Sequence, residues 1–195
     1  MLPFQYNFYM EKSLIVAALP SEFFLPTESN SRIYYSGIGK INATCLVTQL
    51  IIEERPGLIL NVGTAGCLRD DLLGSVFGVK EVIERDMNAE PLAPRGTVPF
   101  SNELPVLKSD FGSAKCASGD SFVTKHDEWL TKNEVDLVDM ELFAIAKVAE
   151  RYGVKWRAIK FASDLANEDA AEHWNDSLSS ANSRISEMIE QALFF

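Results

Sequence analysis

Short, uninterrupted apolar runs alternate along this chain with segments of helical periodicity. The runs at 13–19 (SLIVAAL) and 58–62 (LILNV) lack the polar alternation of half-exposed strands, and such runs are typical of central strands covered on both faces. Residues 156–162 (WRAIKFA) predict another strand, after a helix expected over 140–152. Strands that alternate with helices in this way predict an α/β fold.

Two further helices and one long loop are expected. A turn at 37–40 leads into a helix whose apolar positions are predicted to be Ile41, Cys45, Thr48 and Ile52. Residues from Ala170 to the C-terminus predict the last helix. The segment 85–113 is rich in Pro, Asn and Gly and predicts mostly loop. Residues in the last helix step three and four positions apart, namely Leu178, Ala181, Ile185, Met188 and Ala192.

Charge and composition exclude several classes of function. The 195 residues carry a formal net charge of -10, which argues against nucleic-acid backbones and anionic membranes as partners. Three scattered cysteines and two histidines form neither a disulfide framework nor a metal-binding pattern, so we expect no metal and a cytoplasmic protein. Residues 10–195 are expected to form one domain, with 1–9 as an alternative start or an appended segment, because Met10 precedes the first strand.

Carboxylates stand at the ends of two predicted strands. Asp139 and Glu141 lie where a short strand at 137–138 leads into a helix, and Asp164 follows the strand at 156–162. We expect Asp139 to cap that helix. In open α/β sheets the strand ends line the ligand crevice, and buried carboxylates are costly unless they are paired or functional. These acids therefore predict one polar ligand site and an enzyme.

Five motifs in order resemble the purine nucleoside phosphorylase and uridine phosphorylase superfamily. Within it they are most similar to the nucleosidase branch, which includes methylthioadenosine/S-adenosylhomocysteine nucleosidases and futalosine hydrolases. The resemblance implies a three-layer α/β/α single domain with a mixed central β-sheet, a homodimer, and no cofactor. The motifs are SGIGKINA at 36–43, NVGTAG at 61–66, SGDSFV at 118–123, VDME at 138–141 and SDLA at 163–166.

The same resemblance implies roles for individual residues. Asp164 would be the general acid that protonates N7 of the purine, and Glu141 would hold the ribose hydroxyls above Met140. Phe122 would stack on the base, while the Val123 backbone would bind the edge of the base. The remaining implied substrate-binding residues are Thr64, Gly66 and Ser163, with Gly63 beside them.

The chemistry of nucleoside cleavage requires these residue types independently of the resemblance. A neutral purine leaves only when it is protonated, and a partly buried aspartate can have a pKa high enough to carry that proton. The sugar becomes an oxocarbenium ion, which a nearby carboxylate stabilises. An aromatic face suits the base.

Two positions decide between water and phosphate as the nucleophile. Phosphorylases of this superfamily place an arginine just before the Gly-Thr/Ser segment, and Asn61 stands there instead, without the charge or the two-pronged donor of arginine. We therefore favour hydrolysis over phosphorolysis. In methylthioadenosine nucleosidases a glutamate after the first strand activates water. Here Ser21 takes its place and Glu22 follows, so either a remodelled turn brings Glu22 to the water or the base lies elsewhere.

The substrate and one non-enzymatic alternative stay open at this point. The chain is shorter than typical members of the family between Glu84 and Lys115, which would open one side of the pocket for a bulky 5′ substituent. Futalosine or aminodeoxyfutalosine, whose cleavage belongs to menaquinone biosynthesis, is therefore the first expectation, ahead of methylthioadenosine and S-adenosylhomocysteine. A chain that lacks the base at Ser21 could instead be a nucleoside-binding regulatory protein.

Overall fold

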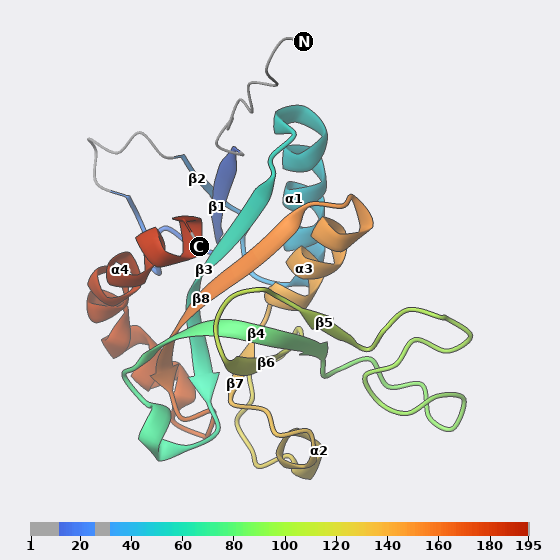
Figure 1. Cartoon of the computed structure of the whole chain (residues 1–195). Coiled ribbons are helices and arrows are strands. Elements are labelled where there is room, and N and C mark those ends of the chain that lie inside the picture. Colours follow the sequence, from blue (N-terminus) through green and yellow to red (C-terminus); the bar gives the residue numbers. More distant parts are fainter. Residues whose placement is uncertain (1–11, 26–31, 195) are drawn as a thin grey trace.

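A mixed, twisted β-sheet forms the centre of the computed structural model, which describes residues 12–25 and 32–194 (Figure 1). Eight strands take part, and β8 pairs with β3 on one side and β4 on the other. Because β3 also pairs with β7, the succession β3-β8-β4-β6-β7 closes on itself. The strands are β1 (Ser13–Ala17), β2 (Ile33–Tyr35), β3 (Leu58–Cys67), β4 (Val76–Glu84), β5 (Val106–Lys108), β6 (Ala114–Ser118), β7 (Leu137–Asp139) and β8 (Lys155–Asp164).

Helices cover both faces of this sheet, which gives the three expected layers. Helices α1 (Lys40–Glu54) and α3 (Leu142–Arg151) pack together on one side, and α4 (Ala170–Phe194) lies on the other (Figure 1). Core clusters on the two faces share the strands β1 and β3. Two short helices, η1 (Asp70–Leu72) and α2 (Glu128–Lys132), lie in connections. The predicted α/β fold with a mixed sheet is confirmed.

The strands β3 and β8 are longer than the sequence pattern indicated. Each continues through the segment expected to follow it, so that 63–66 and 163–164 are strand and not turn. All ten residues of β3 are buried. The pairing between β3 and β8 shifts register between Ala65 and Gly66, and β3 then pairs with β7 at Gly66. This irregularity bends β3 at the point where it meets the strand that ends in Asp139.

Helix α1 presents a different face to the core than the predicted one. Its buried residues are Ala43, Val47, Leu50 and Ile51, whereas Ile41 and Ile52 are exposed by 77% and 59%. Both stripes have helical spacing, and the packing against α3 and the sheet selects the first. The predicted stripe of α4 is confirmed, since Ala181, Ile185 and Ala192 are buried in the core.

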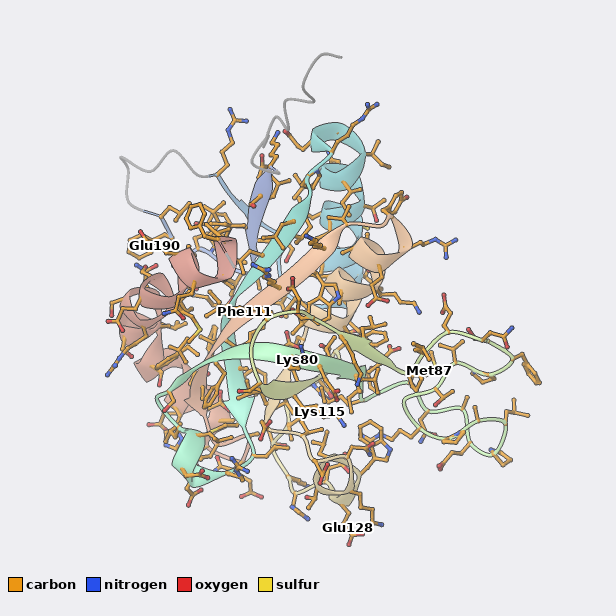
Figure 2. All side chains as sticks on the ribbon, in the orientation of Figure 1. Lys80, Met87, Phe111, Lys115, Glu128 and Glu190 are labelled. Carbon is orange, nitrogen blue, oxygen red and sulfur yellow. The ribbon has the colours of Figure 1, made fainter. Side chains whose placement is uncertain are left out.

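Residues 85–113 are mostly loop, as expected, with one strand that the pattern did not indicate. That strand, β5, pairs antiparallel with β4, while residues 86–105 project from the body of the protein (Figure 1). Figure 2 shows Met87 where this loop leaves the sheet. The expectation for residues 1–9 lies outside the described residues, and the domain bounds 10–195 stay a prediction. No helix in the described ranges is long and apolar enough to cross a membrane.

Candidate active site

One pocket lies where β3, β6, β7 and β8 end, and the predicted site residues line it except Gly63, which lies beside the Glu22 carboxylate. The sequence separates these residues widely, but the neighbouring strand ends bring them together, as expected for an α/β sheet. The predicted residues that line the pocket are Glu22, Thr64, Gly66, Phe122, Val123, Met140, Glu141, Ser163 and Asp164.

Asp164 ends β8, and local hydrogen bonds orient its carboxylate. The Ser163 hydroxyl donates to Oδ2 at 2.8 Å, and the Ala166 amide donates to Oδ1 at 3.0 Å. Gly66 provides the space for this carboxylate, because a Cβ at position 66 would lie 2.8 Å from Asp164 Oδ1. Asp164 is 3% exposed. It is therefore a fixed, nearly buried acid on the pocket wall.

Glu141 lies between β7 and α3, is 7% exposed, and lines the pocket. The Gly39 amide donates to Oε1 at 2.9 Å, and Gly39 has φ 97°, a conformation that favours glycine. Burial and the nearby charge of Asp139 raise the pKa of Glu141 to about 7, although Lys160 and the Gly39 amide act in the opposite direction. Its ionisation therefore changes in the physiological pH range.

A buried ion pair holds Asp139, two residues before Glu141 in the sequence. Lys160 Nζ lies 2.8 Å from Asp139 Oδ2, with both side chains almost fully buried, and Ser118 also donates to Asp139. Burial opposes the ionisation of Asp139, but Lys160 and the hydrogen bonds lower its pKa overall. The predicted helix start is wrong by two residues: α3 begins at Leu142, whose amide donates to Asp139 at 2.9 Å, and Glu141 occupies the N-cap position.

Glu22 reaches the pocket from the turn after β1. The Thr64 amide and hydroxyl both donate to Oε1, the former at 3.2 Å, and the Leu19 amide donates to Oε2 at 3.2 Å. Glu22 is 7% exposed. Glu22 therefore lines the pocket, as a remodelled turn requires, and its role in activating water stays a prediction.

The segment after β6 carries Phe122 and Val123 to the pocket rim. Phe122 is 48% exposed, so it is a pocket residue and not part of the core. The guanidinium of Arg85 holds this segment by donating to the Gly119 carbonyl at 2.9 Å and to the Ser121 hydroxyl at 3.1 Å. It also donates to the Ser121 carbonyl. Met140 lies half-buried on the same wall as Glu141.

Two pocket residues, Arg85 and Trp174, have no signal in the sequence pattern, and a third, Ile38, lies in the motif at 36–43 without a predicted role. Arg85 directly follows β4, at the start of the predicted loop, and contacts the segment at 119–121. The Trp174 indole N–H donates to the Thr64 hydroxyl at 2.8 Å, across 110 positions of sequence. Neither contact follows from periodicity or spacing. Within the described part of the chain no group of His, Cys, Asp and Glu is placed to hold a metal ion.

Comparisons with known proteins show the family of this chain. The family model described as "Phosphorylase superfamily" matches residues 28–193. A 5′-methylthioadenosine/S-adenosylhomocysteine nucleosidase of Staphylococcus haemolyticus is 30% identical over 179 residues, which cover 81% of this chain and 78% of the relative. A nucleosidase of the same name from Staphylococcus aureus has the same identity and coverage.

Solved structures show the same fold. The 5′-methylthioadenosine/S-adenosylhomocysteine nucleosidase of Helicobacter pylori matches with a TM-score of 0.79 and 21% identity, over 95% of this chain and 98% of that one. Futalosine hydrolase of Helicobacter pylori matches with a TM-score of 0.79 and 22% identity, over 94% and 97%. The chain therefore belongs to the phosphorylase superfamily and, within it, to the nucleosidase branch, whose members are hydrolases of N-glycosidic bonds.

Proposed function

We propose that this protein hydrolyses the N-ribosidic bond of a purine nucleoside that carries a 5′ substituent. The observation that supports it most is the convergence of Asp164, Glu141 and Glu22 on one pocket. Each of these three carboxylates is held by at least one backbone amide. Three oriented carboxylates match the three requirements of the reaction: a proton for the base, stabilisation of the sugar cation, and activation of water.

In the proposed mechanism Asp164 donates its proton to N7 of the purine as the bond between C1′ and N9 breaks. The bonding electron pair stays on the base, which leaves as a neutral purine, and positive charge develops on the sugar. Glu141 accepts hydrogen bonds from the ribose hydroxyls and stabilises this charge. Water attacks C1′ and gives a proton to Glu22, so the products are a free base and a free 5′-substituted ribose.

Two features support water over phosphate as the nucleophile. Asn61 lies in β3 away from the pocket, and its side-chain amide donates to the Val16 carbonyl at 3.0 Å. Arg85 lines the pocket, but its guanidinium is engaged by the segment at 119–121. A two-pronged grip on phosphate would require breaking those hydrogen bonds.

The 5′ substituent separates two candidate substrates. The loop at 86–105 projects from the body (Figure 1), and the residues that line the pocket include none from this loop. This supports room for a bulky substituent, as in futalosine or aminodeoxyfutalosine of menaquinone biosynthesis. The names of the relatives at 30% identity favour methylthioadenosine and S-adenosylhomocysteine instead. Both candidates share the reaction and differ only in the 5′ group.

Chromatography of released base tests the proposal. The protein is incubated with futalosine, aminodeoxyfutalosine, methylthioadenosine, S-adenosylhomocysteine and adenosine, each with and without phosphate. We expect base release that does not depend on phosphate, and the relative rates identify the substrate. Asp164→Asn should lose at least a hundredfold in rate, whereas Asp71→Asn, on the exposed helix η1, serves as the matched control.

The other outcomes separate the alternatives. Release that requires phosphate would make the protein a phosphorylase and would overturn the argument from Asn61. Binding of nucleosides without release from any of them would favour the regulatory protein. The position of Glu22 in the pocket argues against that alternative.

We also propose a homodimer, as the resemblance implies. Large apolar side chains are exposed on and beside α1, among them Ile38, Ile41 and Ile52, and Phe100 is 94% exposed on the projecting loop. Exposed apolar surface of this kind marks protein interfaces. Sedimentation velocity should show a dimer, and a monomer at all concentrations would refute this part of the proposal.

A further inference from the structure

Trp174 donates a hydrogen bond that continues to the proposed water-activating carboxylate. Its indole Nε1 lies 2.8 Å from the Thr64 hydroxyl oxygen, and that hydroxyl donates in turn to Glu22 Oε1. The three residues come from helix α4, strand β3 and the turn after β1. The hydrogen bonds therefore connect three segments that are far apart in the sequence at one side of the pocket.

The direction of this hydrogen-bond chain follows from the chemistry of its members. An indole N–H can only donate, and a hydroxyl has a single proton to give. Once Trp174 occupies a lone pair of the Thr64 oxygen, the Thr64 proton points to an acceptor, and Glu22 provides one. Hydrogen bonds in such a chain polarise and strengthen one another in a site of low dielectric constant.

The backbone completes the constraint on Glu22. The Thr64 amide donates to the same Oε1 that accepts from the Thr64 hydroxyl, and the Leu19 amide donates to Oε2. Both carboxylate oxygens are thus fixed, and only the lone pairs that face the pocket are left for a water molecule. Among these donors the Thr64 hydroxyl alone can rotate, and Trp174 restricts that rotation.

We propose that Trp174 is a positioning residue for water activation, which acts through the Thr64 hydroxyl on Glu22. This inference rests on the proposed function, in which Glu22 takes the proton of water. Helix α4 is suited to this role because a second bond holds its first turns to the site: the Ser177 hydroxyl donates to the Ser163 carbonyl at 2.8 Å. The indole is therefore attached to an anchored helix and not to a free surface segment.

Trp174→Phe isolates the hydrogen bond, because it keeps an aromatic ring and removes the N–H. We expect kcat for base release to fall about fivefold, the equivalent of one hydrogen bond. Affinity for a 7-deaza analogue of the substrate, which has no N7 to protonate, should stay within about twofold of the wild-type protein. Trp129→Phe is the matched control, since Trp129 packs outside the pocket against Arg95.

A double-mutant cycle distinguishes positioning from a general loss of structure. In a Thr64→Val background the hydroxyl is absent, so adding Trp174→Phe should lower kcat by less than a further twofold. A merely structural role of Trp174 would retain its fivefold effect in that background. Such additivity, or an equal loss of affinity for the 7-deaza analogue, would overturn the inference.

The NMR signal of the Trp174 indole N–H gives a readout that does not require activity. The signal is identified by its absence in Trp174→Phe. It should move in Thr64→Val and also in Glu22→Gln, and it should not move in Trp129→Phe. If the protein releases no base from any nucleoside but the signal responds in this way, the proposed function fails and the hydrogen-bond chain stands. A signal that responds to neither substitution refutes the chain even in an active enzyme.

Discussion

The ionisation of Glu141 should weaken the fold as the pH rises through neutrality. Burial and the charge of Asp139 raise the pKa of Glu141 from 4.5 to about 7 in the folded protein. Between these two values the folded state holds a proton that the unfolded state has lost, so the free energy of unfolding falls as the pH increases. Within this interval the free energy of unfolding falls by about 1.4 kcal/mol for each pH unit. Over the whole interval, from pH 4.5 to about 7, it falls by about 3 kcal/mol.

Glu141→Gln removes this dependence while it keeps the size of the side chain and an oxygen that can accept from the Gly39 amide. The stabilising contribution of protonated Glu141 is fully present below pH 4.5 and is lost as the pH rises through about 7. Urea unfolding of both proteins at several pH values between 4.5 and 8 measures the difference in their free energies of unfolding.

We expect the wild-type protein to lose about 3 kcal/mol relative to Glu141→Gln across this range. A difference that stays constant within about 0.5 kcal/mol, which is the usual variation among surface substitutions, would refute the reasoning. The same ionisation predicts that base release slows below about pH 7, because protonated Glu141 cannot stabilise the sugar cation.

Three further predictions concern other parts of the site. Gly66→Ala should lower base release about a hundredfold, because the new Cβ would meet Asp164 Oδ1 at 2.8 Å; an unchanged rate would show that Asp164 tolerates displacement. Lys160→Met should cost about 3–5 kcal/mol in urea unfolding by leaving Asp139 buried without its partner, and adding Asp139→Asn should recover part of that loss. Phe122→Ala should raise KM roughly tenfold, the value of one stacking contact, whereas Phe122→Tyr should not; equal KM values in both variants would exclude stacking.

The candidate site was predictable to the extent that its residues lie in short local motifs. Asp164 and Glu141 each stand within a few residues of a strand that the pattern indicates, and a strand end directs its neighbours to a known edge of the sheet. Phe122 lies in the motif at 118–123. Glu22 was predictable as a candidate only, because its side chain reaches the pocket through the geometry of one turn.

Several features required the tertiary structure because two arrangements satisfied the same local pattern. Helix α1 has apolar residues on two faces, and packing against α3 selects Val47 and not Ile41 for the core. The extension of β3 through Gly66 depends on pairing with β7 and β8, which come much later in the chain.

The sequence by itself determined that apolar strands are followed along the chain by small residues and carboxylates. From this it predicted an α/β protein with one polar site. The tertiary structure alone decided which distant groups meet. The pair Asp139–Lys160 and the bond from Trp174 to Thr64 join strands and helices far apart in sequence. Periodicity describes only near neighbours, whereas these contacts depend on how the closed succession of strands and helix α4 pack together.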